Sequence, residues 1–135
     1  MTLFQKSDDM KRRIKILLAV LSVFLIISIT AYYFIERNLK NLKNTVIDPI
    51  ELSEVEDGVY IGKYSSIPVS ATVQVSVEDH RIISISIIEH VNGQGSKAES
   101  IIDEIIRTQS IDVDVISGAT YSSQVIKQAV SKALR

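Results

Sequence analysis

Residues 69–77 have the sequence VSATVQVSV, in which apolar and polar residues alternate without a break. Strict alternation is typical of a β-strand that buries one face. A polar tetrad at 78–81 follows, after which Ile83, Ile85 and Ile87 alternate with serines in the same way. Two such segments around one tight turn predict an antiparallel hairpin.

Other segments add to this hairpin. Residues 58–64 resemble a further short strand ahead of it, and residues 113–116 suggest another strand after it. Between them, residues 96–99 (SKAE) match the S-x-x-E capping box. In that motif Ser96 caps a helix that begins at Lys97, and the glutamate reaches back to the serine.

Two apolar stripes at helical spacing would pack on this sheet. The first stripe consists of Ala98, Ile101, Ile102, Ile105 and Ile106. The second stripe, which continues to the C-terminus, consists of Val125, Ile126, Ala129, Val130 and Ala133. The predicted fold class is therefore α+β: a small antiparallel sheet, formed by the hairpin and short strands, with two packed helices over residues 55–135.

An uncharged apolar run over residues 16–35 precedes the domain. Its length of about 20 residues suffices to cross the hydrocarbon core of a bilayer as a helix. A cleaved signal peptide is the alternative, but its apolar region should be shorter, at about 7 to 15 residues, with a small-residue cleavage site after it. We therefore expect one N-terminal transmembrane helix.

The charges on either side of this run predict the topology. Residues 1–15 carry five Lys or Arg residues, and the flank that follows the run carries three. By the positive-inside rule, residues 1–15 form a cytoplasmic tail of a single-pass protein of the cell membrane. Residues 36–54 are expected to form a polar stalk or linker, and residues 55–135 the extracytoplasmic domain.

The composition argues against several kinds of chemistry. The 135 residues have room for one modest core and include no cysteine, so disulfides, thiolate nucleophiles and cysteine-held iron–sulfur clusters are excluded. Residues 55–135 contain seven basic and ten acidic residues, a poor composition for nucleic-acid binding. The two histidines lack the H-x-x-x-H spacing, so no metal site is expected. Redox chemistry would need an organic cofactor.

Residues 114–120 have the sequence DVISGAT and combine small and polar residues ahead of the last helix. In a purely structural interpretation, Gly118 forms a turn and Thr120 or Ser117 caps the helix. Asp114 then accepts hydrogen bonds from loop amides. In a functional interpretation, free backbone N–H groups and the positive end of the helix dipole lie beside a hydroxyl, an arrangement that suits a phosphate.

This segment resembles the flavinylation motif D-x-x-(S/T)-G-A-(T/S) of the bacterial FMN-binding domains. Such domains occur in the C and G subunits of the sodium-pumping NADH:quinone reductase and of the Rnf complex, and in small stand-alone proteins. The resemblance implies that a flavin transferase takes FMN from FAD and joins its phosphate covalently to Thr120. Gly118 and Ala119 would let the backbone approach the phosphate. Asp114 and Ser117 would serve recognition or turn geometry.

The resemblance covers about residues 55–135. Residues 57–60 (DGVY), the hairpin and both helices occur in the same order as in the family. The chain is much shorter than the subunits of the respiratory complexes, so the resemblance leaves its redox partner open.

Other candidate residues have a weaker basis. His90 precedes a polar loop at 92–95, and family members often have a polar loop near the flavin, so we include His90 among the cofactor-binding candidates. A solvated loop histidine is the equal alternative. His80 falls in the predicted turn, where exposure explains it. Gly93 and Gly95 do not continue into the G-x-G-x-x-G fingerprint, and the chain has no G-x-S-x-G signature, so no catalytic residue is assigned.

The favoured function is electron transfer by a membrane-anchored extracytoplasmic flavoprotein, whose isoalloxazine ring exchanges electrons. An electron carrier or a subunit of a redox complex is expected rather than a stand-alone enzyme. Its partners would be the flavin transferase, membrane lipid and a membrane or extracytoplasmic redox protein. Two alternatives stay open: a module that binds FMN or another ligand reversibly, and a structural accessory subunit in which Thr120 is only a helix cap.

Overall fold

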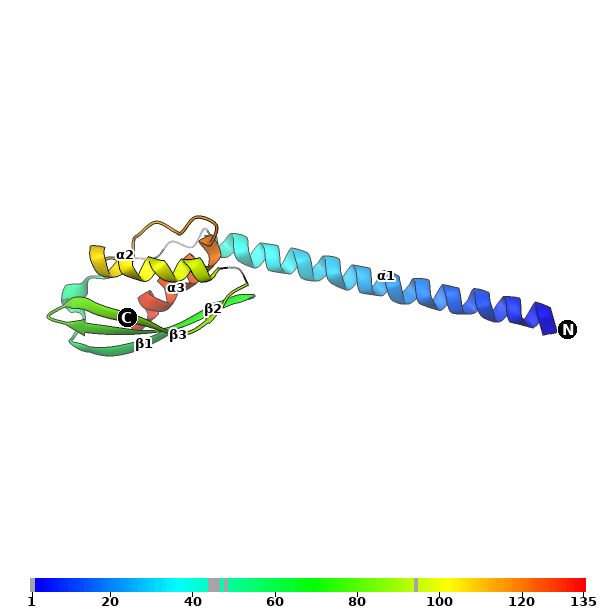
Figure 1. Ribbon diagram of the computed structural model, residues 1–135, viewed down its shortest axis with the longest axis horizontal. Helices are drawn as coiled ribbons and strands as arrows, with labels where there is room; N and C mark the ends of the chain where they lie inside the picture. The colour runs from blue at the N-terminus through cyan, green and yellow to red at the C-terminus, as the bar shows by residue number, and fades with distance from the viewer. Residues whose placement is uncertain (1, 44–46, 48, 94) are drawn as a thin grey trace. The chain divides into compact units, whose positions relative to one another are not determined.

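The chain forms two compact units, Met1–Glu36 and Arg37–Arg135. The computed structural model describes residues 2–43, 47, 49–93 and 95–135. Its first element is a long helix, α1 (Thr2–Lys43), followed by the strands and shorter helices of a small α+β domain (Figure 1).

Helix α1 has an exposed apolar surface. Its segment Met10–Leu42 is long and apolar enough to cross a membrane, and the most apolar 18-residue stretch within it has a mean hydropathy of 2.6. Large apolar side chains along it are exposed, as Phe24 is at 69%. The hydroxyls of Ser22, Ser28 and Thr30 donate to carbonyls three or four residues earlier, at 2.8 to 2.9 Å. These polar groups are therefore satisfied within the helix, as a lipid environment requires.

Three antiparallel strands form the sheet of the second unit, in the order β1-β2-β3 (Figure 1). They are β1 (Gly58–Ser66), β2 (Val69–Glu78) and β3 (Arg81–Val91). The turn between β2 and β3 consists of Asp79 and His80, with φ angles of 50° and 57°. Two central residues with positive φ form a type I′ turn, whose twist matches that of the flanking strands. The predicted hairpin is confirmed, and the alternating apolar residues of β2 are all buried.

The alternation predicted for β3 is wrong at Ile83, because the register between β2 and β3 shifts there. Val77 pairs with Ile82 and Ser76 pairs with Ser84, so Ile83 is an extra residue. The core therefore receives Ile82, which is 2% exposed, whereas Ile83 is 48% exposed. A bulge of one residue reverses the pattern of inward and outward side chains along a strand.

Two helices pack on the sheet, α2 (Ile101–Thr108) and α3 (Thr120–Ala133). Helix α3 lies against β1 and β2, and α2 lies against β3. The apolar stripe predicted for the C-terminal helix is buried in α3, as expected. In α2, Ile105 is completely buried, whereas Ile102 and Ile106 are half-buried at the margin of the core.

The capping box predicted at residues 96–99 is wrong. Ser96–Ser100 form a 3-10 turn, η2, and the α-helix begins only after it. The carboxylate of Glu99, instead of reaching back to the serine, lies 3.0 Å from Nδ1 of His90 on β3. A tertiary partner has therefore replaced the local capping bond.

The short strand predicted at residues 113–116 is also wrong, since in the described structure this segment pairs with no strand. Its backbone bonds to side chains of α3. Lys127 Nζ donates to the Val113 carbonyl at 2.6 Å, and Ser123 Oγ accepts from the Ile116 amide at 3.0 Å. Helix side chains thus satisfy backbone groups that a strand ladder would otherwise satisfy.

The C-terminal end of α1 and the segment between α1 and the sheet also contribute to the core of the second unit. Leu42 is 2% exposed, and Val55, which follows the 3-10 turn η1 (Leu52–Glu54), is 8% exposed. Ile50 packs against the same apolar cluster. Apolar residues of the segment predicted as a stalk, residues 36–54, therefore lie in the domain core.

Candidate functional site

The DVISGAT segment forms a turn that leads into α3. The Ala119 amide donates to the Ile116 carbonyl at 2.9 Å, which closes a four-residue β-turn. Gly118, at the third position of this turn, has a φ angle of 79°. A positive φ there is characteristic of type II turns and strains any residue that has a Cβ. The backbone of the turn therefore favours glycine at position 118.

A hydroxyl from the first turn of α3 holds this β-turn in place. Ser123 Oγ accepts a hydrogen bond from the Ile116 amide at 3.0 Å and donates one to the Ala119 carbonyl at 2.9 Å. The Ser123 side chain is completely buried. Ser123 lies outside the DVISGAT motif, so the motif does not predict this role. The local signal for it was a serine placed to bond the carbonyl four residues earlier.

Thr120 is the first residue of α3 and is half-buried. The N-cap position is occupied by Ala119, so neither Thr120 nor Ser117 caps the helix, which contradicts the capping interpretation. Among the described residues, no side chain from the N-cap bonds the amides of the first turn, and that turn contains no acidic residue. These amides and the positive end of a 14-residue helix favour an anion beside the Thr120 hydroxyl.

A cavity of about 200 Å³ lies at this helix N-terminus. Its lining consists of Val69, Gly93, Gly95 and the run Gly118, Ala119, Thr120, Tyr121 and Ser122. The loop approaches α3 closely, because a Cβ on Gly95 would overlap Ser122 Oγ. A Cβ on Gly118, in contrast, would have no described atom within 4 Å. Gly95 therefore permits the close approach of its loop to α3, whereas the space beside Gly118 is open.

Asp114 is exposed and lies near a buried lysine. Lys127 is 7% exposed, and its burial lowers the pKa of the ammonium group below the usual 10.5. The negative charges of Asp112 and Asp114 oppose this shift of the pKa. Asp114 therefore helps to balance a buried cation that bonds the Val113 carbonyl, and its role in recognition by a transferase stays a prediction.

The imidazole of His90 is almost completely buried. Its side chain is 2% exposed, so the alternative of a solvated loop histidine is wrong. Nδ1 lies 3.0 Å from a Glu99 carboxylate oxygen and 3.2 Å from the side-chain nitrogen of Asn92. Nε2 is buried and has no hydrogen-bond partner within the described part of the chain. His90 thus contacts the start of the loop that lines the cavity, and direct contact with a cofactor stays a prediction.

His80 has a structural role. Its Nδ1 lies 2.8 Å from the Val55 carbonyl oxygen, and its backbone amide donates to Asp57 Oδ1 at 3.3 Å. These bonds connect the turn between β2 and β3 to the segment that precedes β1.

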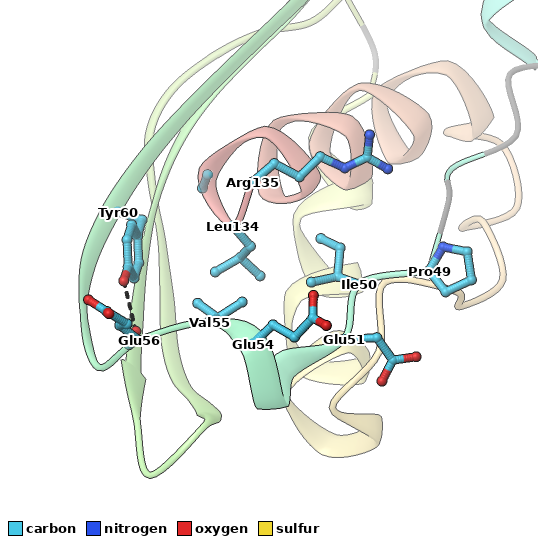
Figure 2. A pocket seen from close by; sticks show the side chains of 10 residues that line it. Pro49, Ile50, Glu51, Glu54, Val55, Glu56, Tyr60, Leu134 and Arg135 are labelled. Carbon is cyan, nitrogen blue, oxygen red and sulfur yellow. Dashed lines mark hydrogen bonds between the residues drawn. The ribbon is translucent and has the colours of Figure 1, made fainter.

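A larger cavity, of about 710 Å³, lies at the C-terminal end of α3 (Figure 2). At 1.5 Å per residue, this end is about 20 Å along the helix from Thr120. The side chains of Ile50, Val55 and Leu134 converge there (Figure 2). The charged residues of its lining are Glu51, Glu54, Glu56 and Arg135. The size suits a small molecule, but the excess of carboxylates disfavours a phosphate, so we place the candidate site at Thr120.

The residues around Thr120 fit the phosphate end of FMN. A helix N-terminus attracts an anion, and a hydroxyl lies beside it with open space at the adjacent turn. At about 200 Å³, the cavity is smaller than the roughly 300 to 1,000 Å³ of typical small-molecule sites. It therefore has room for part of the cofactor and leaves the rest outside.

Comparison with known proteins identifies the family. The family model described as FMN-binding domain matches residues 64–135, which include the turn and α3. The chain belongs to this FMN-binding domain family, and FMN is the cofactor that the family implies. An uncharacterized protein of Treponema pallidum (strain Nichols) is 30% identical to it over 86 residues, which cover 62% of this chain and 24% of that protein. The chain thus spans about a quarter of the length of this relative.

Proposed function

We propose that the chain is a membrane-anchored flavoprotein that carries FMN covalently on Thr120 and transfers electrons outside the cytoplasm. The position of Thr120 carries this proposal, because it is the first residue of α3 and lines a cavity bordered by glycines. The family match supports FMN as the cofactor. The DVISGAT sequence supports attachment through a phosphoester.

Attachment needs a hydroxyl nucleophile and a phosphate held beside it. With FAD as the donor, the bond between Thr120 Oγ1 and phosphorus forms while the phosphoanhydride bond to AMP breaks. AMP leaves, the hydroxyl proton is released, and no electrons are transferred in this step. The N-terminus of α3 would stabilise the negative charge that stays on the phosphoester. A flavin transferase supplies the catalysis, so this chain supplies only the acceptor.

When bound, the flavin supplies the electron chemistry, and the protein retains and orients it. A covalent bond prevents loss of the cofactor outside the cytoplasm, where a dissociated FMN would diffuse away. With α1 as a membrane anchor, the domain stays at a raised effective concentration near membrane partners. The donor and the acceptor are membrane or extracytoplasmic redox partners.

Reversible FMN binding and a purely structural role are the competing functions. The acidic lining of the larger cavity argues against that cavity as a reversible site for a phosphorylated flavin. The deciding experiment is expression of the full chain with and without a flavin transferase, followed by denaturing electrophoresis. We expect fluorescence that survives denaturation only with the transferase. Colour lost on denaturation would support reversible binding, and a colourless protein would support the structural role.

A further inference from the structure

Tyr121 takes part in none of the hydrogen bonds or ring contacts described above for this domain, whereas the other two tyrosines of the domain have such contacts. Tyr60 donates to a backbone carbonyl at 2.8 Å, and the Tyr64 ring lies 5.2 Å from Lys132 Nζ. Tyr121 follows Thr120 directly, lines the same cavity and is 36% exposed. Within the described residues its ring has no aromatic or cationic partner. A partly exposed aromatic ring that lines a candidate cofactor cavity offers a surface for a ligand.

The size of the cavity determines which part of the cofactor needs this surface. At about 200 Å³ it does not enclose a whole flavin mononucleotide. If the phosphate is fixed at Thr120, the ribityl chain leads outward and the isoalloxazine lies outside the cavity. A planar ring in that position gains from an offset stack on a neighbouring aromatic side chain.

We propose that Tyr121 is the stacking platform for the isoalloxazine ring. This inference rests on the proposed attachment at Thr120. Tyr121 belongs to the first turn of α3, whose next two residues, Ser122 and Ser123, are buried, so the ring projects from a fixed backbone. An aromatic side chain with few rotatable bonds loses little entropy on making such a contact. The opposite face of the isoalloxazine stays open to solvent and to a redox partner.

Flavin fluorescence tests the contact without any measurement of activity. A phenol ring in contact with a flavin quenches its fluorescence by electron transfer, an indole quenches it strongly, and a phenyl ring does so poorly. In the full chain, flavinylated and solubilised in detergent, Tyr121→Phe should raise the fluorescence per bound FMN severalfold, and Tyr121→Trp should lower it. Tyr64→Phe, which changes a phenol elsewhere in the domain, is the matched control and should have no effect. The bimolecular rate constant for iodide quenching, calculated with the fluorescence lifetime of each protein, should be comparable to that of free FMN.

Two results would overturn the inference in different ways. Equal fluorescence and lifetime in the wild type, Tyr121→Phe and Tyr121→Trp, with FMN present by intact mass, would overturn the stacking role of Tyr121 and leave the attachment intact. Strong protection from iodide would contradict the open face. An intact mass without FMN would overturn the proposed function itself and, with it, this inference.

Discussion

The buried hydroxyl of Ser123 accepts a hydrogen bond from the Ile116 amide 3.0 Å away, and so connects α3 to the turn that precedes Thr120. The same oxygen donates to the Ala119 carbonyl at 2.9 Å. One side chain outside the DVISGAT sequence therefore holds both ends of the turn. We therefore expect Ser123 to help fix the backbone that leads into Thr120.

Removal of this hydroxyl should loosen the turn. Ser123→Ala leaves a partly buried amide without its partner, which costs about 1 to 3 kcal/mol in the free energy of unfolding. We also expect slower flavin incorporation, because Thr120 is held less rigidly. Urea unfolding and a time course of in-gel fluorescence measure the two effects. Ser122→Ala deletes the neighbouring buried hydroxyl but leaves the Ile116 bond intact, and equal effects of the two variants would contradict this account.

Among the residues of α2, Ile101 and Ile105 should contribute most to the stability of the core, because both are completely buried. Ile105 is completely buried, so Ile105→Ala should cost about 2 to 5 kcal/mol, whereas Ile102→Ala should cost less because its side chain is half-buried. Urea unfolding of the domain in the full chain compares the two variants. A larger loss for Ile102→Ala would show that α2 is rotated relative to the structure described.

Stability should depend on pH through Lys127. Burial lowers the pKa of Lys127 in the folded state, so the unfolded state binds this proton more tightly. The contribution of Lys127 to the free energy of unfolding therefore rises with pH between the lowered pKa and the ordinary value of 10.5. Urea titrations at several pH values should show that the free energy of unfolding of the wild type rises relative to that of Lys127→Met as the pH increases across this window. Lys132 is exposed, so Lys132→Met is the control and should show no such change relative to the wild type. Parallel plots of unfolding free energy against pH for the wild type and Lys127→Met would contradict the prediction.

The direction of membrane insertion is open to a direct test. Residues 1–15 carry five Lys or Arg residues against three after the apolar run, so the domain should lie outside the cytoplasm. A phosphatase that is active only outside the cytoplasm should be active when fused after Arg135. A fusion with a cytoplasmic reporter at the same position should be inactive. Activity of the cytoplasmic reporter alone would reverse the topology.

Patterns that depend on neighbouring residues predicted much of the fold. The alternation in residues 69–77 predicted the buried face of β2, and the polar tetrad after it predicted the tight turn. The apolar stripe of α3 was likewise predicted correctly. In each case the spacing of the apolar residues in the sequence matches the set of side chains that are buried, because the sheet and the helix pack on one core.

Errors arose where a distant residue competes with a local pattern. The bulge at Ile83 depends on pairing with β2, which the alternation in β3 alone does not reveal. The carboxylate of Glu99 contacts His90 rather than Ser96. Ser123 likewise lies seven residues from the amide it binds, across a turn whose geometry the motif does not specify. Such contacts are decided by tertiary packing, whereas the motif itself predicted the turn ahead of α3.

The covalent attachment of FMN to Thr120 is the central claim, and peptide mass spectrometry of the full chain expressed with a flavin transferase tests it most directly. We predict one peptide heavier by one FMN less one water, with the added mass on Thr120. The gain should be absent in Thr120→Ala, which has no nucleophilic oxygen, and at least partly retained in Thr120→Ser. Ser117→Ala should stay modifiable. Added mass on Tyr121, Ser122 or Ser123, or undiminished flavin in denatured Thr120→Ala, would contradict the account.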